Sequence, residues 1–140
     1  MTAPDGGMVV SVNTSARKTV RKTRGQAGNL IFDRGFEGDA HAGDWHRQVS
    51  LLGQESIEKM VDRGLHVGAG DFAENITTSG IDLLAFPVGS VLSVGDEVRL
   101  EISQIGKVCH IRCAIFIQAG DCVMPREGVF AVVRVPGRVQ

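Results

Sequence analysis

The chain has 140 residues and a net charge of −1, with 43% hydrophobic and 22% charged residues. These values match an ordinary globular protein and exclude a disordered tail or a coiled coil as the main form. The length fits one domain, which we expect to span residues 1–140. Because the charges nearly cancel, no global field favours nucleic acid or a membrane surface, and we expect neither as a partner.

The compartment is predicted from what the sequence lacks. Its first ten residues, MTAPDGGMVV, include an acidic residue and no long apolar region, so no signal peptide is expected. No run approaches the roughly 18–20 apolar residues of a membrane helix. The cysteine count of three is odd, which favours reduced thiols. We therefore expect a cytoplasmic protein.

The 18 glycines, many beside aspartate, predict repeated tight turns between short strands. This pattern is typical of a mainly β domain, a barrel or a sandwich. In residues 97–105, Val98, Leu100 and Ile102 alternate with polar residues, the period of a half-buried strand. The predicted strands and short apolar runs cover residues 8–13, 28–33, 49–52, 72–78, 90–94, 97–105 and 129–135, with a loop over residues 34–48.

A helix is predicted over residues 54–63, because Ile57, Met60 and Val61 have the spacing of one apolar helix face. Glu55 and Lys59 form a favourable i,i+4 pair. Gly64 follows where a C-terminal cap belongs. Residues 109–118 are compatible with a second short helix.

The segment around residues 107–122 is the first candidate for chemistry. Its three thiols are Cys109, Cys113 and Cys122. Lys107, His110 and Arg112 supply positive charge, which lowers a thiol pKa and favours the reactive thiolate. The alternative is that the cysteines are small buried hydrophobic residues. A Cys109–Cys113 disulfide is not expected in a reducing compartment.

Two polar loops are the next candidates. The glycine-flanked segment 38–47 contains Asp39, His41 and Arg47, and glycines let a backbone approach a ligand closely. With the cysteines, its histidines could bind zinc, although the cysteine spacing fits no standard zinc motif. Otherwise its side chains bond to their own backbone. The basic segment 17–24, with Lys18 and Lys22, suits a phosphate-bearing ligand or forms a solvated loop. Neither a Walker motif nor GxGxxG is present.

Glu74 and Asn75 are adjacent on the strand predicted over residues 72–78. One of them is therefore expected to face inward and to need a partner, either a ligand or the backbone.

Four motifs occur in order and together resemble the MOSC domain family, in its small stand-alone bacterial form. They are GDAHAG at 38–43, RQVSLL at 47–52, GDFAENIT at 70–77 and DCVMPREGVF at 121–130. The resemblance implies a barrel-like β fold with a few short helices. It also implies binding of the molybdenum cofactor, a pyranopterin phosphate carrying molybdenum. Because the chain stops soon after Pro136-Gly137, a final strand of longer members is expected to be short or missing.

The resemblance also assigns roles to residues. The family's cysteine after an arginine matches Arg112-Cys113, so Cys113 is the first choice for carrying sulfur or ligating molybdenum, with Cys109 and Cys122 in reserve. The residues expected to hold the cofactor are Lys18, Lys22, Asp39, His41, Arg47, Glu74, Asn75 and Arg112. Pyridoxal phosphate belongs to a separate domain of full-length sulfurases and is not expected here.

Several functions stay open at this point. As a sulfur carrier, the domain would take sulfur from a donor protein and serve a molybdoenzyme. As a binding module, it would shield or deliver the cofactor without turnover. A structural zinc or redox protein is a third interpretation. The fourth is detoxification of N-hydroxylated bases, as in some relatives that have extra electron-transfer domains.

Overall fold

The computed structural model of the chain describes residues 7–16, 22–64, 66–106 and 127–140. Within these ranges the protein is mainly β, as predicted. The strands are β1 (Met8–Thr14), β2 (Thr23–Gly25), β3 (Gly28–Ile31), β4 (Gly35–Phe36), β5 (Val49–Gly53), β6 (Ile76–Ser79), β7 (Val91–Val94), β8 (Val98–Ile105), β9 (Val129–Val135) and β10 (Gly137–Val139). The helices in the described residues are α1 (Gln54–Val61) and a short 3₁₀ helix, η1 (Leu83–Ala85).

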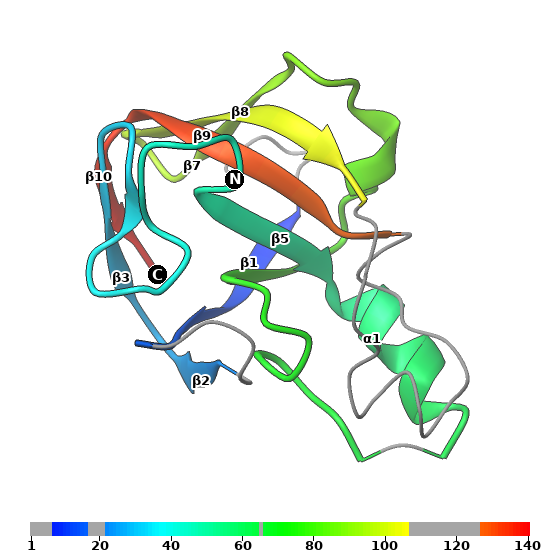
Figure 1. Ribbon diagram of the computed structural model, residues 1–140. Coiled ribbons are helices and arrows are strands. Elements are labelled where there is room, and N and C mark those ends of the chain that lie inside the picture. Colours follow the sequence, from blue (N-terminus) through cyan, green and yellow to red (C-terminus); the bar gives the residue numbers. More distant parts are fainter. Residues whose placement is uncertain (1–6, 17–21, 65, 107–126) are drawn as a thin grey trace.

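Two sheets make up this fold. The larger sheet has the order β2-β1-β6-β5-β9-β8-β7, and the smaller has the order β10-β3-β4. Their pairings are antiparallel except for β5 and β6, which are parallel. Figure 1 shows the large sheet curled into part of a barrel, which confirms the barrel-like prediction. Only Pro136 separates β9 from β10, so one segment joins the two sheets.

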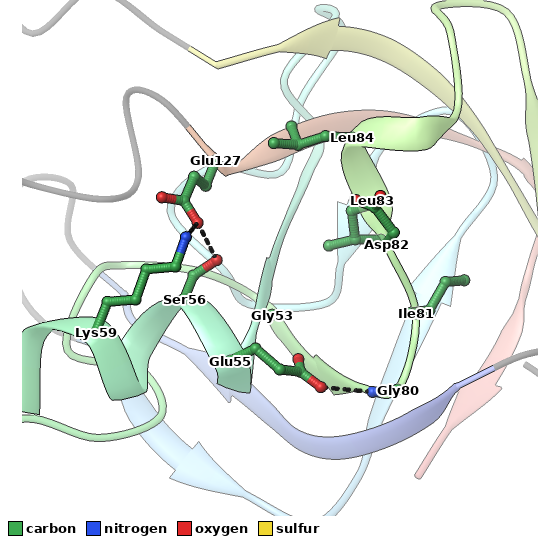
Figure 2. Close-up of a pocket in the computed structure, with 10 residues that line it drawn as sticks. All are labelled: Gly53, Glu55, Ser56, Lys59, Gly80, Ile81, Asp82, Leu83, Leu84 and Glu127. Carbon is green, nitrogen blue, oxygen red and sulfur yellow. Dashed lines mark hydrogen bonds and ion pairs between the residues drawn. The ribbon is translucent and has the colours of Figure 1, made fainter.

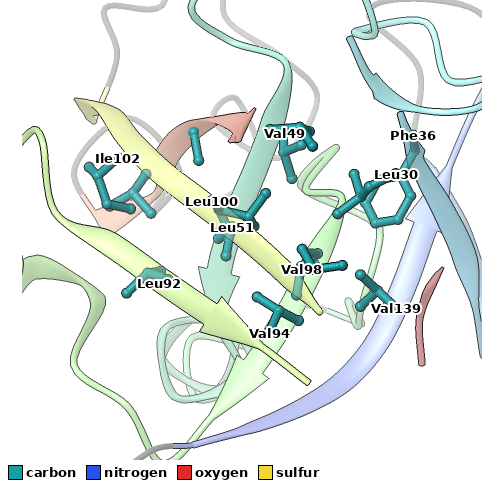
Figure 3. Close-up of a cluster of buried hydrophobic side chains, with 14 of the residues drawn as sticks. Leu30, Phe36, Val49, Leu51, Leu92, Val94, Val98, Leu100, Ile102 and Val139 are labelled. Atoms are coloured by element: carbon teal, nitrogen blue, oxygen red, sulfur yellow. The ribbon is translucent and has the colours of Figure 1, made fainter. Parts of the chain in front are cut away.

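The hydrophobic core lies on the inner face of the curl. Val98, Leu100 and Ile102 of β8 are all buried there, which confirms the alternation predicted for this strand. Figure 3 shows their side chains close to those of Val49 and Leu51, with Leu30 and Phe36 of the small sheet nearby. The small sheet therefore covers part of the same core.

Helix α1 follows β5 directly and ends two residues earlier than predicted. Ile57 and Met60 are buried, but Val61 is 46% exposed, so it does not belong to the predicted apolar face. Glu55 accepts a hydrogen bond from the Gly80 amide (2.7 Å), and Lys59 pairs with Glu127. Each member of the predicted i,i+4 pair thus contacts a different part of the fold. No helix in the described ranges is long and apolar enough to cross a membrane.

The strand predicted over residues 72–78 begins later than expected, at Ile76. Gly70 has φ +89° and Ala73 has φ +62°, so the chain turns here instead of extending. The turn places Glu74 and Asn75 just before β6. The predicted loop 34–48 contains the short strand β4, while the predicted helix 109–118 lies outside the described residues.

Candidate functional site

Polar side chains are buried on the face of the large sheet opposite the core. Val49 and Leu51 belong to the core cluster, whereas Ser50 between them does not. Because side chains alternate along a strand, Ser50 faces the other way. The same alternation holds in β1 and β6, and yet these polar residues are also nearly inaccessible to solvent. We call the following residues the polar network: Ser11, Asn13, Lys22, Asp39, His41, Ser50, Glu74, Asn75 and Thr77.

Asn75 is the centre of this network. Its Oδ1 accepts a hydrogen bond from the Ser50 amide (3.0 Å). Its Nδ2 donates to the Asn13 carbonyl (3.2 Å) and to Asp39 Oδ2 (3.0 Å). One side chain thereby ties β5, β1 and the loop containing Asp39 together.

Asp39 forms a buried ion pair with Lys22. The Lys22 Nζ lies 2.7 Å from Asp39 Oδ1, and both side chains have 0% exposure. The Ser15 amide also donates to Oδ1 (3.0 Å). Burial by itself raises the pKa of Asp39, but the hydrogen bonds from Lys22, Ser15 and Asn75 outweigh it and hold the pKa below its ordinary value. Asp39 is therefore ionised at neutral pH.

His41 lies at the edge of the network. Its Nδ1 is 2.9 Å from the Lys22 Nζ, and its backbone amide donates to Asp39 Oδ2 (3.1 Å). The imidazole stacks on Trp45 with a centroid distance of 6.3 Å and an interplanar angle of 3°. The Trp45 Nε1 donates to the His41 carbonyl (2.7 Å). Ring and backbone are both held in place.

Glu74 is a buried carboxyl with 0% exposure. Its Oε2 accepts a hydrogen bond from the Thr77 hydroxyl (2.8 Å), which itself accepts one from Asn13 Nδ2 (3.0 Å). Its Oε1 has no hydrogen-bond partner among the described residues. Burial raises the pKa of Glu74, and the hydrogen bonds from Thr77 and from nearby backbone amides only partly oppose this.

We expect the raised pKa of Glu74 to appear in the pH dependence of stability. A carboxyl whose pKa is higher in the folded state stabilises the fold below its unfolded pKa. This contribution is lost as the pH rises through the folded pKa. Urea unfolding from about pH 4.5 upwards should show wild type losing stability relative to Glu74→Gln, which does not titrate. Parallel pH profiles for the two proteins would contradict this assignment.

Thr77 and Thr78 offer a matched test of the network. Both are buried in β6, but Thr78 Oγ1 has no partner among the described residues, whereas Thr77 bonds to Asn13 and Glu74. Thr77→Val should lower the free energy of unfolding by about 1–3 kcal/mol, because it leaves buried polar groups unpaired. Thr78→Val, which removes an unpaired hydroxyl, should be neutral or stabilising. If both variants lose the same free energy of unfolding in denaturant, the hydrogen bonds of Thr77 do not contribute to stability as described.

Arg47 belongs to a neighbouring cluster. Its Nε donates to Gln104 Oε1 (3.1 Å), and its Cζ lies 5.2 Å from the centre of the Phe130 ring. The strand register pairs Ser50 with Phe130, and Phe130 with Gln104. The cluster thus continues the row of the polar network across the sheet. Within the described ranges no hydrogen bond uses the terminal nitrogens of Arg47, so they can bind an anion.

With this geometry established, comparison with known proteins identifies the family. The family model for the MOSC domain matches residues 37–139, well over half of the chain. The chain belongs to the MOSC domain family. This confirms the resemblance seen in the sequence and links the chain to a family associated with the molybdenum cofactor. No curated protein matches this MOSC chain.

Solved structures show the same MOSC fold at low sequence identity. YuaD from Bacillus subtilis has a TM-score of 0.77 and 16% identity, with 95% of this chain and 90% of YuaD covered. YiiM from Escherichia coli has a TM-score of 0.66 and 18% identity over 96% of this chain and 66% of YiiM. YiiM from Geobacillus stearothermophilus gives 0.69 and 18%, covering 96% and 71%. At such identities the likeness establishes the fold alone.

The structure brings together Lys22, Asp39, His41, Glu74 and Asn75 of the predicted MOSC site, with Arg47 in the adjoining cluster. The other predicted site residues lie outside the described residues: Lys18, Cys109, Arg112, Cys113 and Cys122. Because all three cysteines are among them, the structure does not test the predicted thiolate or zinc chemistry. Where the chain is described, no group of three or more His, Cys, Asp or Glu residues could hold a metal ion.

Several members of the network were not predicted from the sequence: Ser11, Asn13, Ser50 and Thr77. One signal was available, because Asn13 and Ser50 each interrupt or flank an apolar run at the position facing away from the core. Alternation predicts their face but not their burial, which depends on segments distant in the sequence.

A separate cavity of about 430 Å³ lies between α1 and η1 (Figure 2). Lys59 Nζ and Ser56 Oγ contact Glu127 Oε1 at its wall (2.9 and 2.7 Å). None of the described residues predicted for the MOSC site lines it. It is therefore distinct from the polar network.

Proposed function

We propose that this MOSC domain binds the molybdenum cofactor beside the polar network and Arg47, and that one cysteine carries sulfur or ligates the metal. Family membership supports the choice of cofactor. The observation that carries the choice of place is the buried, charged network on the outer face of the sheet, next to an arginine whose terminal nitrogens have no partner in the described part of the chain. Burying polar and charged groups costs free energy even when they are paired, so their concentration on one face of the sheet supports a functional site there.

The residues present fit a phosphate-bearing pterin. The Phe130 ring and Gln104 hold the Arg47 guanidinium, whose planar donors match phosphate oxygens. Asp39, Glu74 and Asn75 are buried and would support the site from within, whereas His41, whose side chain is 22% exposed, would offer a hydrogen-bonding group to the heterocycle. Lys18, the other predicted phosphate contact, would add a second cation, whereas Lys22 bonds to Ser15, Asp39 and His41 and would act through them.

When bound, the cofactor would supply a molybdenum centre that accepts soft sulfur ligands. The chain would supply a thiolate from Cys113, with Cys109 and Cys122 as alternatives. Arg112 would favour the ionised form of that thiol. Sulfur would come from a donor protein and serve a molybdoenzyme, and simple delivery of the cofactor without turnover is the second candidate.

Arg47 provides the test of the cofactor site. The chain is purified from a host that makes the cofactor, and bound pterin is measured by fluorescence after oxidation. Arg47→Met should lower the affinity for pterin roughly tenfold or more, since hydrogen bonds to charged groups are worth about 1.5–3 kcal/mol. Lys59→Met, at the separate cavity, is the matched control and should retain pterin. Equal retention in the two variants would contradict this site.

Cys113 provides the test of the sulfur role. Intact-mass measurement of wild type should show a gain of about 32 Da for one persulfide sulfur. Cys113→Ser should remove this gain. Retained pterin with no sulfur gain in wild type would support the delivery module instead. Stoichiometric zinc without pterin would support a structural zinc or redox protein.

A further inference from the structure

A short contact between two nitrogen atoms determines the chemistry of His41. The Lys22 Nζ lies 2.9 Å from His41 Nδ1, 2.7 Å from Asp39 Oδ1 and 3.3 Å from Ser15 Oγ. The Lys22 side chain has 0% exposure. The three hydrogens of its ammonium group therefore have three acceptors inside the protein, and water does not compete for them.

The direction of the Lys22–His41 hydrogen bond follows from the chemistry of the two groups. An ammonium group has donors and no acceptor, so His41 Nδ1 must offer its lone pair. The Asp39 carboxylate, 2.7 Å from the Lys22 Nζ, forms an ion pair with it. A proton on Nδ1 would instead turn two donors toward each other, and in a doubly protonated ring it would also bring two cations together, which is strongly unfavourable. The remaining proton of a neutral imidazole is then on Nε2.

The orientation of the His41 ring is fixed as well. The ring lies parallel to Trp45, at 3°, and the Trp45 Nε1 bonds to the His41 carbonyl. The His41 amide bonds to Asp39 Oδ2. The other charged group facing the ring among the described residues is Asp39 itself, with its Oδ2 3.9 Å from Nδ1.

We propose that Lys22 is a positioning residue that holds His41 as the neutral tautomer protonated on Nε2. His41 then acts toward a ligand as a hydrogen-bond donor to an acceptor oxygen, and neither as a general base nor as a metal ligand. The identity of that ligand rests on the proposed function, while the tautomer follows from the geometry alone. Lys22 thus affects a bound ligand only through the tautomer of His41.

Nitrogen-15 NMR of the imidazole rings in wild type tests the proposal directly. At about pH 8, above the ordinary histidine pKa of about 6.5, solvated histidines exchange tautomers and give averaged signals. His41, assigned by comparison with His41→Gln, should instead give one pattern, with a protonated Nε2 and an unprotonated Nδ1. A proton on Nδ1, or an averaged pattern, would overturn the proposal.

Variants of Lys22 test the cause. In Lys22→Met the single pattern should be lost, whereas the signals of His46, which contacts Gln104 instead, should not move. Should this variant unfold, Lys22→Met with Asp39→Asn removes the unpaired carboxylate and gives the same readout. An unchanged His41 pattern in a folded variant would overturn the proposal.

Pterin content is measured in parallel. A wild type without pterin but with the expected tautomer rejects the cofactor and supports the role of Lys22.

Discussion

Replacement of Asp39 by alanine is expected to lower the free energy of unfolding by about 3–5 kcal/mol, because it leaves the Lys22 ammonium buried without its partner. The Ser15 amide and Asn75 Nδ2 lose an acceptor at the same time. This loss measures the cost of leaving a charge buried without a partner. It does not measure how much the ion pair stabilises the fold.

Urea unfolding at neutral pH, followed by fluorescence, measures this effect. The chain has one tryptophan and no tyrosine, so the emission reports on Trp45 beside His41. Asp44→Ala, at an exposed position in the same loop, is the control and should change stability little. Adding Lys22→Met to Asp39→Ala should recover part of the loss, since the unpaired cation is then gone. Similar stabilities for Asp39→Ala and Asp44→Ala would contradict the buried pair.

Asn75→Ala is expected to lower the free energy of unfolding by about 2–4 kcal/mol, because it leaves several buried polar groups without partners. The substitution leaves the Asn13 carbonyl without its side-chain donor and removes a donor to Asp39. It also removes the Oδ1 acceptor of the Ser50 amide. Asn75→Asp keeps the shape but puts a second carboxylate beside Asp39, so it should destabilise the fold as well.

The control for Asn75 is Asn29→Ala, since Asn29 is exposed on β3. Both variants are compared by denaturant midpoint at equal slope, so that a change in the denatured state is recognised. If Asn75→Ala unfolds at the same denaturant concentration as Asn29→Ala, Asn75 does not link β5, β1 and the Asp39 loop as described.

The fold was largely predictable from local patterns. The alternation of Val98, Leu100 and Ile102 predicted β8 and its inner face, and residues 129–135 form β9 as expected. The predicted start of β6 was wrong. Phe72 and Ala73 are residue types that occur in strands, but Gly70 and Ala73 have positive φ angles and form a turn. Turn geometry depends on backbone contacts that the apolar pattern does not contain.

The site was predictable only in part. The GDAHAG and ENIT motifs indicated Asp39, His41, Glu74 and Asn75 individually. Their meeting depends on contacts across long sequence separations, such as Asn75 to Asp39 and Asn13 to Thr77. Lys22 belonged to a basic run that suggested either a phosphate contact or a solvated loop, yet its side chain is buried because Asp39 offers it a charged partner. Pairing of this kind depends on the tertiary structure and cannot be predicted from the composition of the segment.

Native mass spectrometry of the protein from a host that makes the molybdenum cofactor is the direct test of cofactor binding. We expect a complex of one chain with one pterin phosphate, which wild type retains and Arg47→Met largely loses. A wild-type chain that carries no pterin from such a host, while remaining folded, would contradict the claim that this MOSC domain binds the cofactor.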